Sequence, residues 1–233
     1  MTRVVPRVIY EDNHLLVVEK PVNVPSQADQ STDPDLLSLL KQDLKYRYQK
    51  PGEVYLGLVH RLDRPVGGVM VFAKTSKAAA RLSAQIRDGE FVKIYLAVVH
   101  GQPEKSQGTL KHWLLKDSSL NKVKVVAESQ MGAKEAILDY QVMAEREGLS
   151  LVRINLQTGR SHQIRVQFST IGHPLYGDQK YGADCNKPGQ QIALWSIQIG
   201  CLHPTKNEKM TFQSAPPNQY PWNLFDGVLW MLD

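Results

Sequence analysis

The chain has few cysteines and none of the common cofactor-binding patterns. Its 233 residues include two cysteines, Cys185 and Cys201, which form no CxxC pair, so no disulfide framework or redox motif is predicted. There is no Rossmann fingerprint and no P-loop, and the histidines do not fall into a metal-ligand spacing. The sequence therefore predicts neither a metal nor a cofactor.

Long apolar runs are also lacking. No stretch approaches the roughly 20 apolar residues that a membrane-spanning helix needs. The opening MTRVVPRVIYEDNHLLVVEK contains no signal-peptide core followed by a small-residue cleavage site. We therefore expect a cytoplasmic protein without a membrane partner. Hydrophobic residues make up 42% of the chain and charged residues 22%, which is ordinary for a globular protein and disfavours disorder.

Positive charge exceeds negative charge, with a formal net charge of +5. Much of the excess lies in two segments, one with Lys41, Lys45, Arg47 and Lys50, the other with Lys105, Lys111, Lys116, Lys122 and Lys124. Either segment alone is most simply a solvated loop. Both segments, together with the arginines near residue 63, favour phosphate contacts and are compatible with a nucleic acid as the partner.

The spacing of apolar residues predicts a few helices among many strands. We expect helices over residues 36–48, 75–87 and 161–171. We expect strands over residues 15–19, 54–59, 69–73, 91–99, 123–128, 135–144, 149–156, 192–201 and 210–213, and a loop over 101–119 with a short strand at 111–115. Because strands and helices do not alternate regularly, the pattern predicts an α+β fold, a single domain with a mixed, largely antiparallel sheet flanked by helices.

The stretch HRLDR, residues 60–64, places one carboxylate inside a basic cluster between two expected strands. An isolated aspartate in a loop is usually a turn or capping residue. Here Arg61 and Arg64 favour the ionised form of Asp63, because a nearby cation stabilises a carboxylate. An ionised Asp63 suits the role of a nucleophile or general base and is poorly suited to that of a general acid.

A second stretch, LQTGRSHQIRVQF at residues 156–168, concentrates hydrogen-bond donors where a helix is expected to begin. The donors are Arg160, His162, Gln163 and Arg165. Solvated basic side chains are the simpler interpretation, but donors that converge at a helix N-terminus are also typical of a site for an anion or an RNA backbone. His162 and Arg165 are three residues apart, so we expect them to share a helix face away from the apolar stripe.

Two further stretches contain tyrosines. KIYLAVVHG, residues 93–101, holds Tyr95 in an apolar strand, where a tyrosine is usually a core residue but can also line a cleft. IGHPLYGDQKYG, residues 171–182, is rich in Gly, Pro and Asp and predicts a loop. Its tyrosines are more often packing residues than base-stacking ones, and Asp178 is most simply a structural turn residue.

These stretches, in this order, resemble the RluA family of RNA pseudouridine synthases. The opening IYEDNHLLVVEKP is similar to the first strands of that family, and the resemblance runs from about residue 8 to residue 217. It implies one catalytic domain over residues 1–233, built around a central RNA-binding cleft and acting without a cofactor on structured ribosomal or transfer RNA. We expect a monomer, and no S4 domain, because the motifs begin close to Met1.

The resemblance also implies residue roles. Asp63 matches the catalytic aspartate, Tyr95 the tyrosine that stacks on the target base, and Arg165 the arginine that pairs with the aspartate. Arg61 matches an arginine that fills the gap left by a flipped nucleotide, and Ile164 matches a residue beside the uracil pocket. The expected RNA contacts are Arg61, Arg64, Arg160, His162, Gln163 and Ile164.

The sequence departs from the family just after the aspartate. The family commonly has HRLDRDTSG, whereas this chain has HRLDRPVGG, so Pro65, Val66 and Gly67 replace Asp, Thr and Ser. The change removes two hydroxyl groups and stiffens the backbone that follows Asp63. It therefore bears on both the loop geometry and the RNA contacts at this point.

Two other functions stay open on the sequence. A non-catalytic RNA-binding protein would share the basic segments but would not need Asp63. A nucleoside or glycosidic hydrolase would also break a glycosidic bond, but such enzymes usually use two carboxylates. Loss of pseudouridine in an Asp63→Asn variant argues against the first alternative, and release of free uracil would argue for the second.

Overall fold

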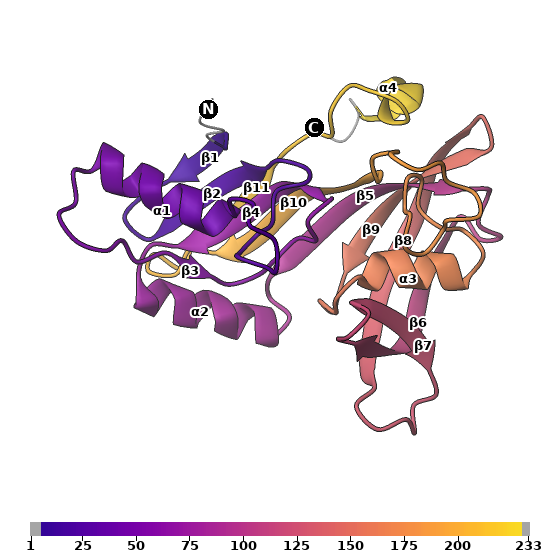
Figure 1. Cartoon of the computed structure of the whole chain (residues 1–233), viewed down its shortest axis with the longest axis horizontal. Coiled ribbons are helices and arrows are strands. Elements are labelled where there is room, and N and C mark those ends of the chain that lie inside the picture. The colour runs from indigo at the N-terminus through magenta and orange to yellow at the C-terminus, as the bar shows by residue number, and fades with distance from the viewer. Residues whose placement is uncertain (1–5, 230–233) are drawn as a thin grey trace. The chain divides into compact units, whose positions relative to one another are not determined.

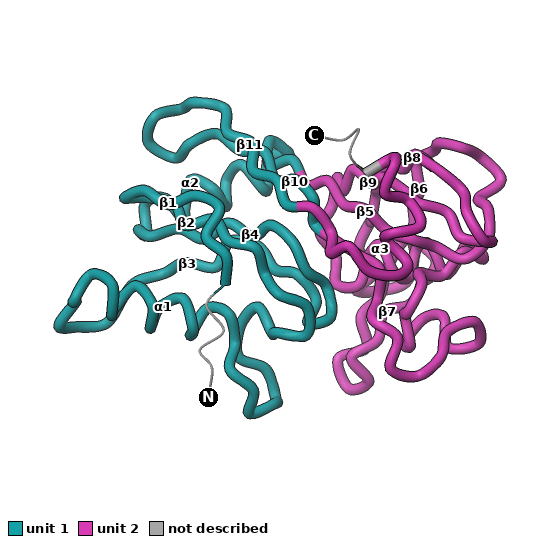
Figure 2. The backbone as a smooth tube through the Cα atoms, turned by 90° about the horizontal axis from the view of Figure 1, so that it is seen from above, with its two compact units in different colours: residues 1–92, 196–214 teal, residues 93–195, 215–233 magenta. Residues whose placement is uncertain are grey.

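The computed structural model describes residues 6–229. The chain forms two compact units, which are described separately below (Figure 2). Unit 1 contains residues up to 92 together with 196–214, and unit 2 contains residues 93–195 and those from 215 onward. The chain passes from one unit to the other within the strands β5 (Val92–His100) and β10 (Leu194–Leu202), so neither unit is continuous in sequence.

Unit 1 is built on strands in the spatial order β1-β2-β4-β10, with β3 paired to β4 and β11 to β10 (Figure 1). The further strands of this unit are β1 (Val8–Glu11), β2 (Leu15–Lys20), β3 (Gly57–Leu58), β4 (Gly67–Ala73) and β11 (Lys209–Gln213). β2 and β4 pair antiparallel from Leu15 opposite Ala73 to Lys20 opposite Gly68. Every residue of β4 is buried, which accounts for its apolar sequence, since a strand covered on both faces has no polar side.

Two helices, α1 (Leu36–Arg47) and α2 (Ser76–Arg87), lie on opposite faces of this sheet (Figure 1). Both begin at a residue that caps free backbone N–H groups. The Asp35 carboxylate accepts a hydrogen bond from the N–H of Ser38 at 3.0 Å, and the Thr75 hydroxyl accepts one from the N–H of Ala78 at 3.1 Å. The helices predicted at these two positions are confirmed to within two residues at their ends.

Unit 2 is built on the strand order β5-β9-β8-β6-β7, and each neighbouring pair is antiparallel. Its further strands are β6 (Gln107–Asp117), β7 (Lys122–Val126), β8 (Lys134–Arg146) and β9 (Leu149–Leu156), and its helices are α3 (Gln163–Thr170), η1 (Trp222–Phe225) and α4 (Asp226–Leu229). The predicted α+β fold with mostly antiparallel strands is therefore confirmed. None of the helices between residues 6 and 229 has both the length and the apolar character to cross a bilayer.

One face of the unit 2 sheet is covered by α3. Tyr95 in β5 lies opposite Ile154 in β9, and Ile154 lies opposite Tyr140 in β8. Directly opposed residues point to the same face of a sheet, so these three side chains share one face. The ring of Tyr140 packs against that of Phe168 in α3, with their centroids 5.6 Å apart. Tyr95 therefore lies on the face that α3 covers.

The strand β6 is longer than the sequence predicted. The sequence predicts a loop over residues 101–119 with a short strand at 111–115, but residues 107–117 form one strand, which pairs with β8 over 107–114 and with β7 over 113–117. The prediction was wrong because Gln107, Thr109 and Lys111 are exposed on the open face of this strand. Polar residues on a solvated strand face have the same composition as a loop.

Candidate active site

Asp63 lies in a short loop of unit 1 between β3 and β4. Its neighbours Leu62 and Val66 are buried, whereas Asp63 itself is partly exposed. A turn follows Asp63, because the N–H of Val66 donates to the Asp63 carbonyl at 2.9 Å. Buried residues on both sides thus hold the loop, and Asp63 between them keeps part of its surface exposed.

A buried lysine lies beneath this loop. The side chain of Lys20, at the end of β2, is 0% exposed. Its ammonium donates to the backbone carbonyls of Pro21 (2.9 Å), Arg64 (3.0 Å) and Val66 (2.8 Å), which uses all three of its N–H groups. Burial lowers the pKa of Lys20 to about 7; the negative charge of Asp63 opposes this shift and the positive charge of Arg64 adds to it. Lys20 therefore ties down the backbone that follows Asp63.

The residues before Asp63 are fixed from the other side. The Ser26 hydroxyl donates to the carbonyl of Leu62 at 2.7 Å and accepts from the N–H of the same residue at 3.2 Å. The ring of His60 accepts from the N–H of Val71 in β4 at 2.9 Å. Lys20 and Ser26, both buried, thus bind backbone atoms on both sides of Asp63 and limit the movement of the loop that carries its carboxylate.

The loop ends at a glycine that the fold requires. Gly68 has φ +115°, and a Cβ atom placed on it would lie 2.3 Å from the carbonyl oxygen of Ser196 in β10. The close approach of the β10 backbone therefore explains why this position is a glycine.

The two arginines of HRLDR are both exposed. Arg64 forms an ion pair with Asp33, a weaker one with Asp29 at 3.8 Å, and a hydrogen bond from its Nε to the carbonyl of Asn23 at 3.2 Å. Its guanidinium thus faces the loop that precedes α1. The expected contact of Arg61 and Arg64 with RNA stays a prediction.

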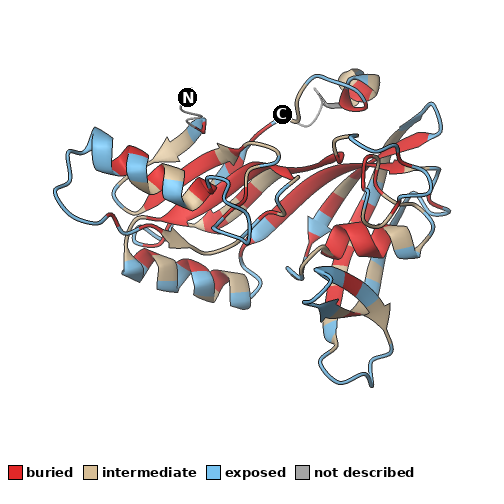
Figure 3. Cartoon of the chain, in the orientation of Figure 1, coloured by how far each residue is buried: buried red, intermediate tan, exposed pale blue. Residues whose placement is uncertain are grey.

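In unit 2 the start of α3 differs from the prediction. The helix was expected from residue 161 but begins at Gln163, and His162 precedes it with φ +51° in the left-handed region. Residues 163–168 are all buried, so Arg165 does not lie on a solvated face (Figure 3). The amide oxygen of Gln163 accepts from the Thr158 hydroxyl (2.8 Å) and the N–H of Arg160 (3.0 Å), which closes the turn that leads into the helix.

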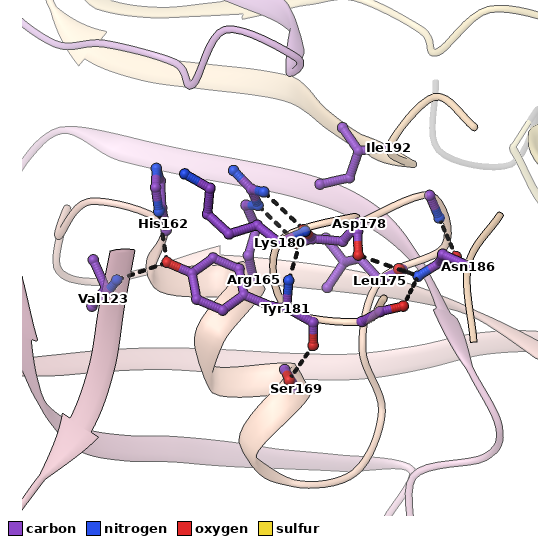
Figure 4. A network of polar contacts seen from close by, with 12 residues as sticks. Val123, His162, Arg165, Ser169, Leu175, Asp178, Lys180, Tyr181, Asn186 and Ile192 are labelled. Atoms are coloured by element: carbon purple, nitrogen blue, oxygen red, sulfur yellow. Dashed lines mark hydrogen bonds and ion pairs between the residues drawn. The ribbon is translucent and has the colours of Figure 1, made fainter. Parts of the chain in front are cut away.

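Arg165 is held by Asp178, a residue that the sequence analysis treated as a turn residue. Nε and one terminal nitrogen of Arg165 each donate to a different oxygen of Asp178, both at 2.8 Å (Figure 4). Burial by itself raises the pKa of Asp178, but the hydrogen bonds and charge of Arg165, with the N–H groups of Lys180 and Tyr181, outweigh it and lower that pKa. The pair is therefore ionised, and it fixes the plane of the guanidinium.

Tyr181 joins Arg165 to His162. The Tyr181 hydroxyl lies 2.7 Å from Nδ1 of His162 and accepts a hydrogen bond from the N–H of Val123 in β7 at 2.9 Å (Figure 4). The Arg165 guanidinium carbon lies 5.3 Å from the centre of the Tyr181 ring. His162 and Arg165 therefore converge, as predicted, but they do so through a tyrosine and not along one helix face.

Within unit 2 the structure brings together several of the predicted residues. Arg160, His162, Gln163, Ile164 and Arg165 lie at the start of α3, which covers the sheet face that carries Tyr95. Sequence reasoning missed the residues that support the site, namely Lys20, Ser26, Asp178 and Tyr181. The stretch LLVVEK contained a signal for Lys20, because a lysine there ends an apolar run. Nothing in the sequence indicated which backbone carbonyls this lysine binds. Over residues 6–229 there is no group of three or more His, Cys, Asp or Glu side chains that could hold a metal ion.

Comparison with known proteins identifies the family. Residues 14–170 match the family model described as RNA pseudouridylate synthase, a range that contains Asp63, Tyr95 and Arg165. The chain is 33% identical over 213 residues to an uncharacterized RNA pseudouridine synthase, YhcT, of Bacillus subtilis, covering 90% of this chain and 68% of that protein. It is 34% identical over 220 residues to the ribosomal large subunit pseudouridine synthase D of Zymomonas mobilis, covering 90% and 69%.

Solved structures support the same fold. The human RNA pseudouridylate synthase domain containing 4 superposes with a TM-score of 0.76 at 24% identity, covering 97% of this chain and 92% of that one. The human RNA pseudouridylate synthase domain containing 1 gives a TM-score of 0.72 at 22% identity, covering 98% and 96%. With the sequence matches, they lead to one conclusion: the chain belongs to the RNA pseudouridylate synthase family, in its RluA branch, whose members are isomerases that act on RNA.

Proposed function

We propose that this protein converts specific uridines of large-subunit ribosomal RNA into pseudouridine, with Asp63 as the catalytic carboxylate. The observation that carries the proposal is the family match over residues 14–170, which includes Asp63, Tyr95 and Arg165. The choice of RNA rests on the names of relatives, since those from Zymomonas mobilis and Buchnera aphidicola are ribosomal large subunit pseudouridine synthases. Transfer RNA is the alternative substrate.

The reaction breaks the N1–C1′ bond of a uridine, turns the freed uracil and joins its C5 to C1′. It is an isomerisation, so the electrons balance without a redox partner. Asp63 either attacks C1′ or removes the proton at C2′, and both roles require the ionised carboxylate in a fixed position. The hydrogen bonds of Lys20 and Ser26 to the loop backbone supply that fixed position.

Tyr95 and Arg165 complete the proposed chemistry. Tyr95 stacks on the flipped base, and Arg165 pairs with Asp63 and orients it. The bidentate bond to Asp178 supports this role, because it holds the plane of the guanidinium in a fixed orientation.

The proposed RNA contacts are Arg61, Arg64, Arg160, His162, Gln163 and Ile164. Arg61 occupies the space that the flipped base leaves. Arg64 already forms an ion pair with Asp33, and the Gln163 amide already closes the turn before α3. A contact of either side chain with RNA would replace these bonds or be made in addition to them. We propose that the two units act together as one catalytic domain, as a monomer in the cytoplasm.

The test uses unmodified large-subunit ribosomal RNA made by in vitro transcription. After incubation with the protein, carbodiimide treatment and reverse transcription locate pseudouridines as stops. We expect new stops with the wild-type protein and none with Asp63→Asn, while the RNA dissociation constants of the two proteins agree within about threefold, because binding is spread over many phosphate contacts.

Other outcomes separate the alternatives. Stops in transfer RNA transcripts but not in ribosomal RNA would move the substrate to transfer RNA. Binding without modification of either RNA would favour a non-catalytic RNA-binding protein. Free uracil in the supernatant would identify a hydrolase.

A further inference from the structure

The side chain of Lys93 belongs to β5, at the first residue of unit 2. It is 8% exposed, yet its ammonium forms no hydrogen bond or ion pair with any other residue of the described range 6–229. Most of this side chain is covered while its ammonium has no acceptor within the protein, and a partly desolvated cation without an acceptor favours a bound anion. Lysines are almost never buried unless they are paired. The position therefore calls for a negatively charged group that the protein itself does not supply.

The surroundings of Lys93 show where that group binds. Lys93 lies two residues before Tyr95 in β5, so both side chains point to the sheet face that α3 covers. A methyl group placed on Gly159 would lie 3.7 Å from Nζ of Lys93. The ammonium therefore lies against the turn that leads into α3, whose N-terminus carries the positive end of the helix dipole.

The charges nearby are positive as well. Arg160 follows Gly159, and its Nε donates to the carbonyl of Glu135 at 2.8 Å, which fixes the guanidinium beside this turn. Burial lowers the pKa of Lys93, and the positive charge of Arg160 lowers it further. An anion placed between the two cations would counter both effects. A neutral uracil would counter neither.

We propose that Lys93, with Arg160 and the turn before α3, binds a backbone phosphate of the substrate RNA, next to the base that Tyr95 receives. The inference rests on the proposed function, since it takes RNA as the ligand. It adds Lys93 to the substrate-binding residues, a position that neither HRLDR nor LQTGRSHQIR contains.

The test compares Lys93→Met, Lys93→Arg and the control Lys77→Met, which changes an exposed lysine of α2. The probe is large-subunit ribosomal RNA made by in vitro transcription, and its dissociation constant is measured between 50 and 300 mM salt. Loss of one phosphate contact should weaken binding about tenfold at low salt and make the slope of log affinity against log salt shallower by about 0.7 to 0.9. Lys93→Arg and Lys77→Met should keep the wild-type slope.

Stability separates a binding role from a structural one. Because the Lys93 ammonium forms no ion pair within the described residues and its stem is covered, the urea unfolding midpoint of Lys93→Met should equal or exceed that of the wild type. A lower midpoint, or a salt slope equal to that of the wild type, would overturn the inference. If the wild type forms pseudouridine but Lys93→Met keeps the wild-type salt slope, this inference alone is wrong and the proposed function is unaffected. A wild type that forms no pseudouridine in either RNA would sink the proposed function, whatever Lys93 does.

Discussion

Arg165 and Asp178 form a bidentate ion pair that is almost closed to solvent. Their side chains are 7% and 0% exposed, and each of the two hydrogen bonds measures 2.8 Å. Removing one partner of a buried ion pair destabilises a protein by more than the intact pair stabilises it, because the remaining charge is left buried without a partner. The arginine predicted to serve the catalytic aspartate thus depends on a second aspartate, 13 residues further along the chain.

Asp178→Asn should therefore destabilise the protein by about 3 kcal/mol. The pKa of Asp178 is lowered in the folded state, so its contribution is complete above the ordinary value of 3.8 and is lost as the pH falls through the folded-state pKa. The difference in unfolding free energy between wild type and variant should be constant from pH 5 to 8 and shrink towards pH 3. Urea unfolding at several pH values measures it. Asp184→Asn, in an exposed position of the same loop, is the control.

Lys20→Met should reduce turnover far more than RNA affinity. The substitution leaves the carbonyls of Arg64 and Val66 without a donor, at about 1 to 3 kcal/mol of stability, and releases the backbone beside Asp63. Single-turnover rates and binding constants for the same RNA separate the two effects. A variant with the wild-type rate would show that the loop holds its shape without Lys20.

Lys20 also predicts a pH dependence of stability. Its pKa is about 7 in the folded protein against an ordinary 10.5, so between these values the unfolded chain binds more protons. The unfolding free energy of the wild type should therefore rise with pH in this window, by at most about 1.4 kcal/mol per pH unit, relative to that of Lys20→Met. Chemical unfolding at pH 7, 8.5 and 10 tests this. Parallel curves for the two proteins would contradict the lowered pKa.

Tyr181→Phe should cost about 1 to 2 kcal/mol, because it removes the acceptor of the Val123 N–H and the partner of His162 while keeping the ring beside Arg165. Since His162 is a proposed RNA contact, KM should rise with little change in kcat. Hydrogen exchange at the Val123 amide should become faster. Tyr55→Phe, at an exposed tyrosine of unit 1, should change none of these quantities.

Gly68→Ala should destabilise unit 1 by more than about 2 kcal/mol, because the new methyl group meets the Ser196 backbone and φ is +115°. Gly52→Ala is the matched control, since nothing lies within 4 Å of its added Cβ. Thermal unfolding of both variants measures the difference. Equal midpoints would show that β10 can shift to accommodate the methyl group.

Local patterns predicted the fold class and most elements. The cap at Thr75, the apolar run of β4 and the glycine pair each specify structure within a few residues, so they can be read directly from the sequence. β6 was missed because the polar residues on its open face hide its alternation.

The supporting contacts of the site could not be read in the same way. Lys20 reaches Val66, 46 residues away, and Ser26 reaches Leu62, 36 residues away. Tyr181 reaches Val123, 58 residues away, across to another strand. Such contacts depend on how the strands are ordered in space, which periodicity does not encode. Whether Asp63, Tyr95 and Arg165 act on one nucleotide stays a prediction.

The two crossings of the chain at β5 and β10 have a consequence for synthesis on the ribosome. Residues 1–92 carry Asp63 and all but the last two strands of unit 1, but β10, which supplies the close neighbour of Gly68, is translated only after nearly the whole of unit 2. The first 92 residues must therefore wait, with one edge of β4 unpaired, until β10 has been synthesised. A chaperone that shields this edge during elongation would raise the yield of folded protein, and a stop codon shortly before residue 196 would leave a product prone to aggregate.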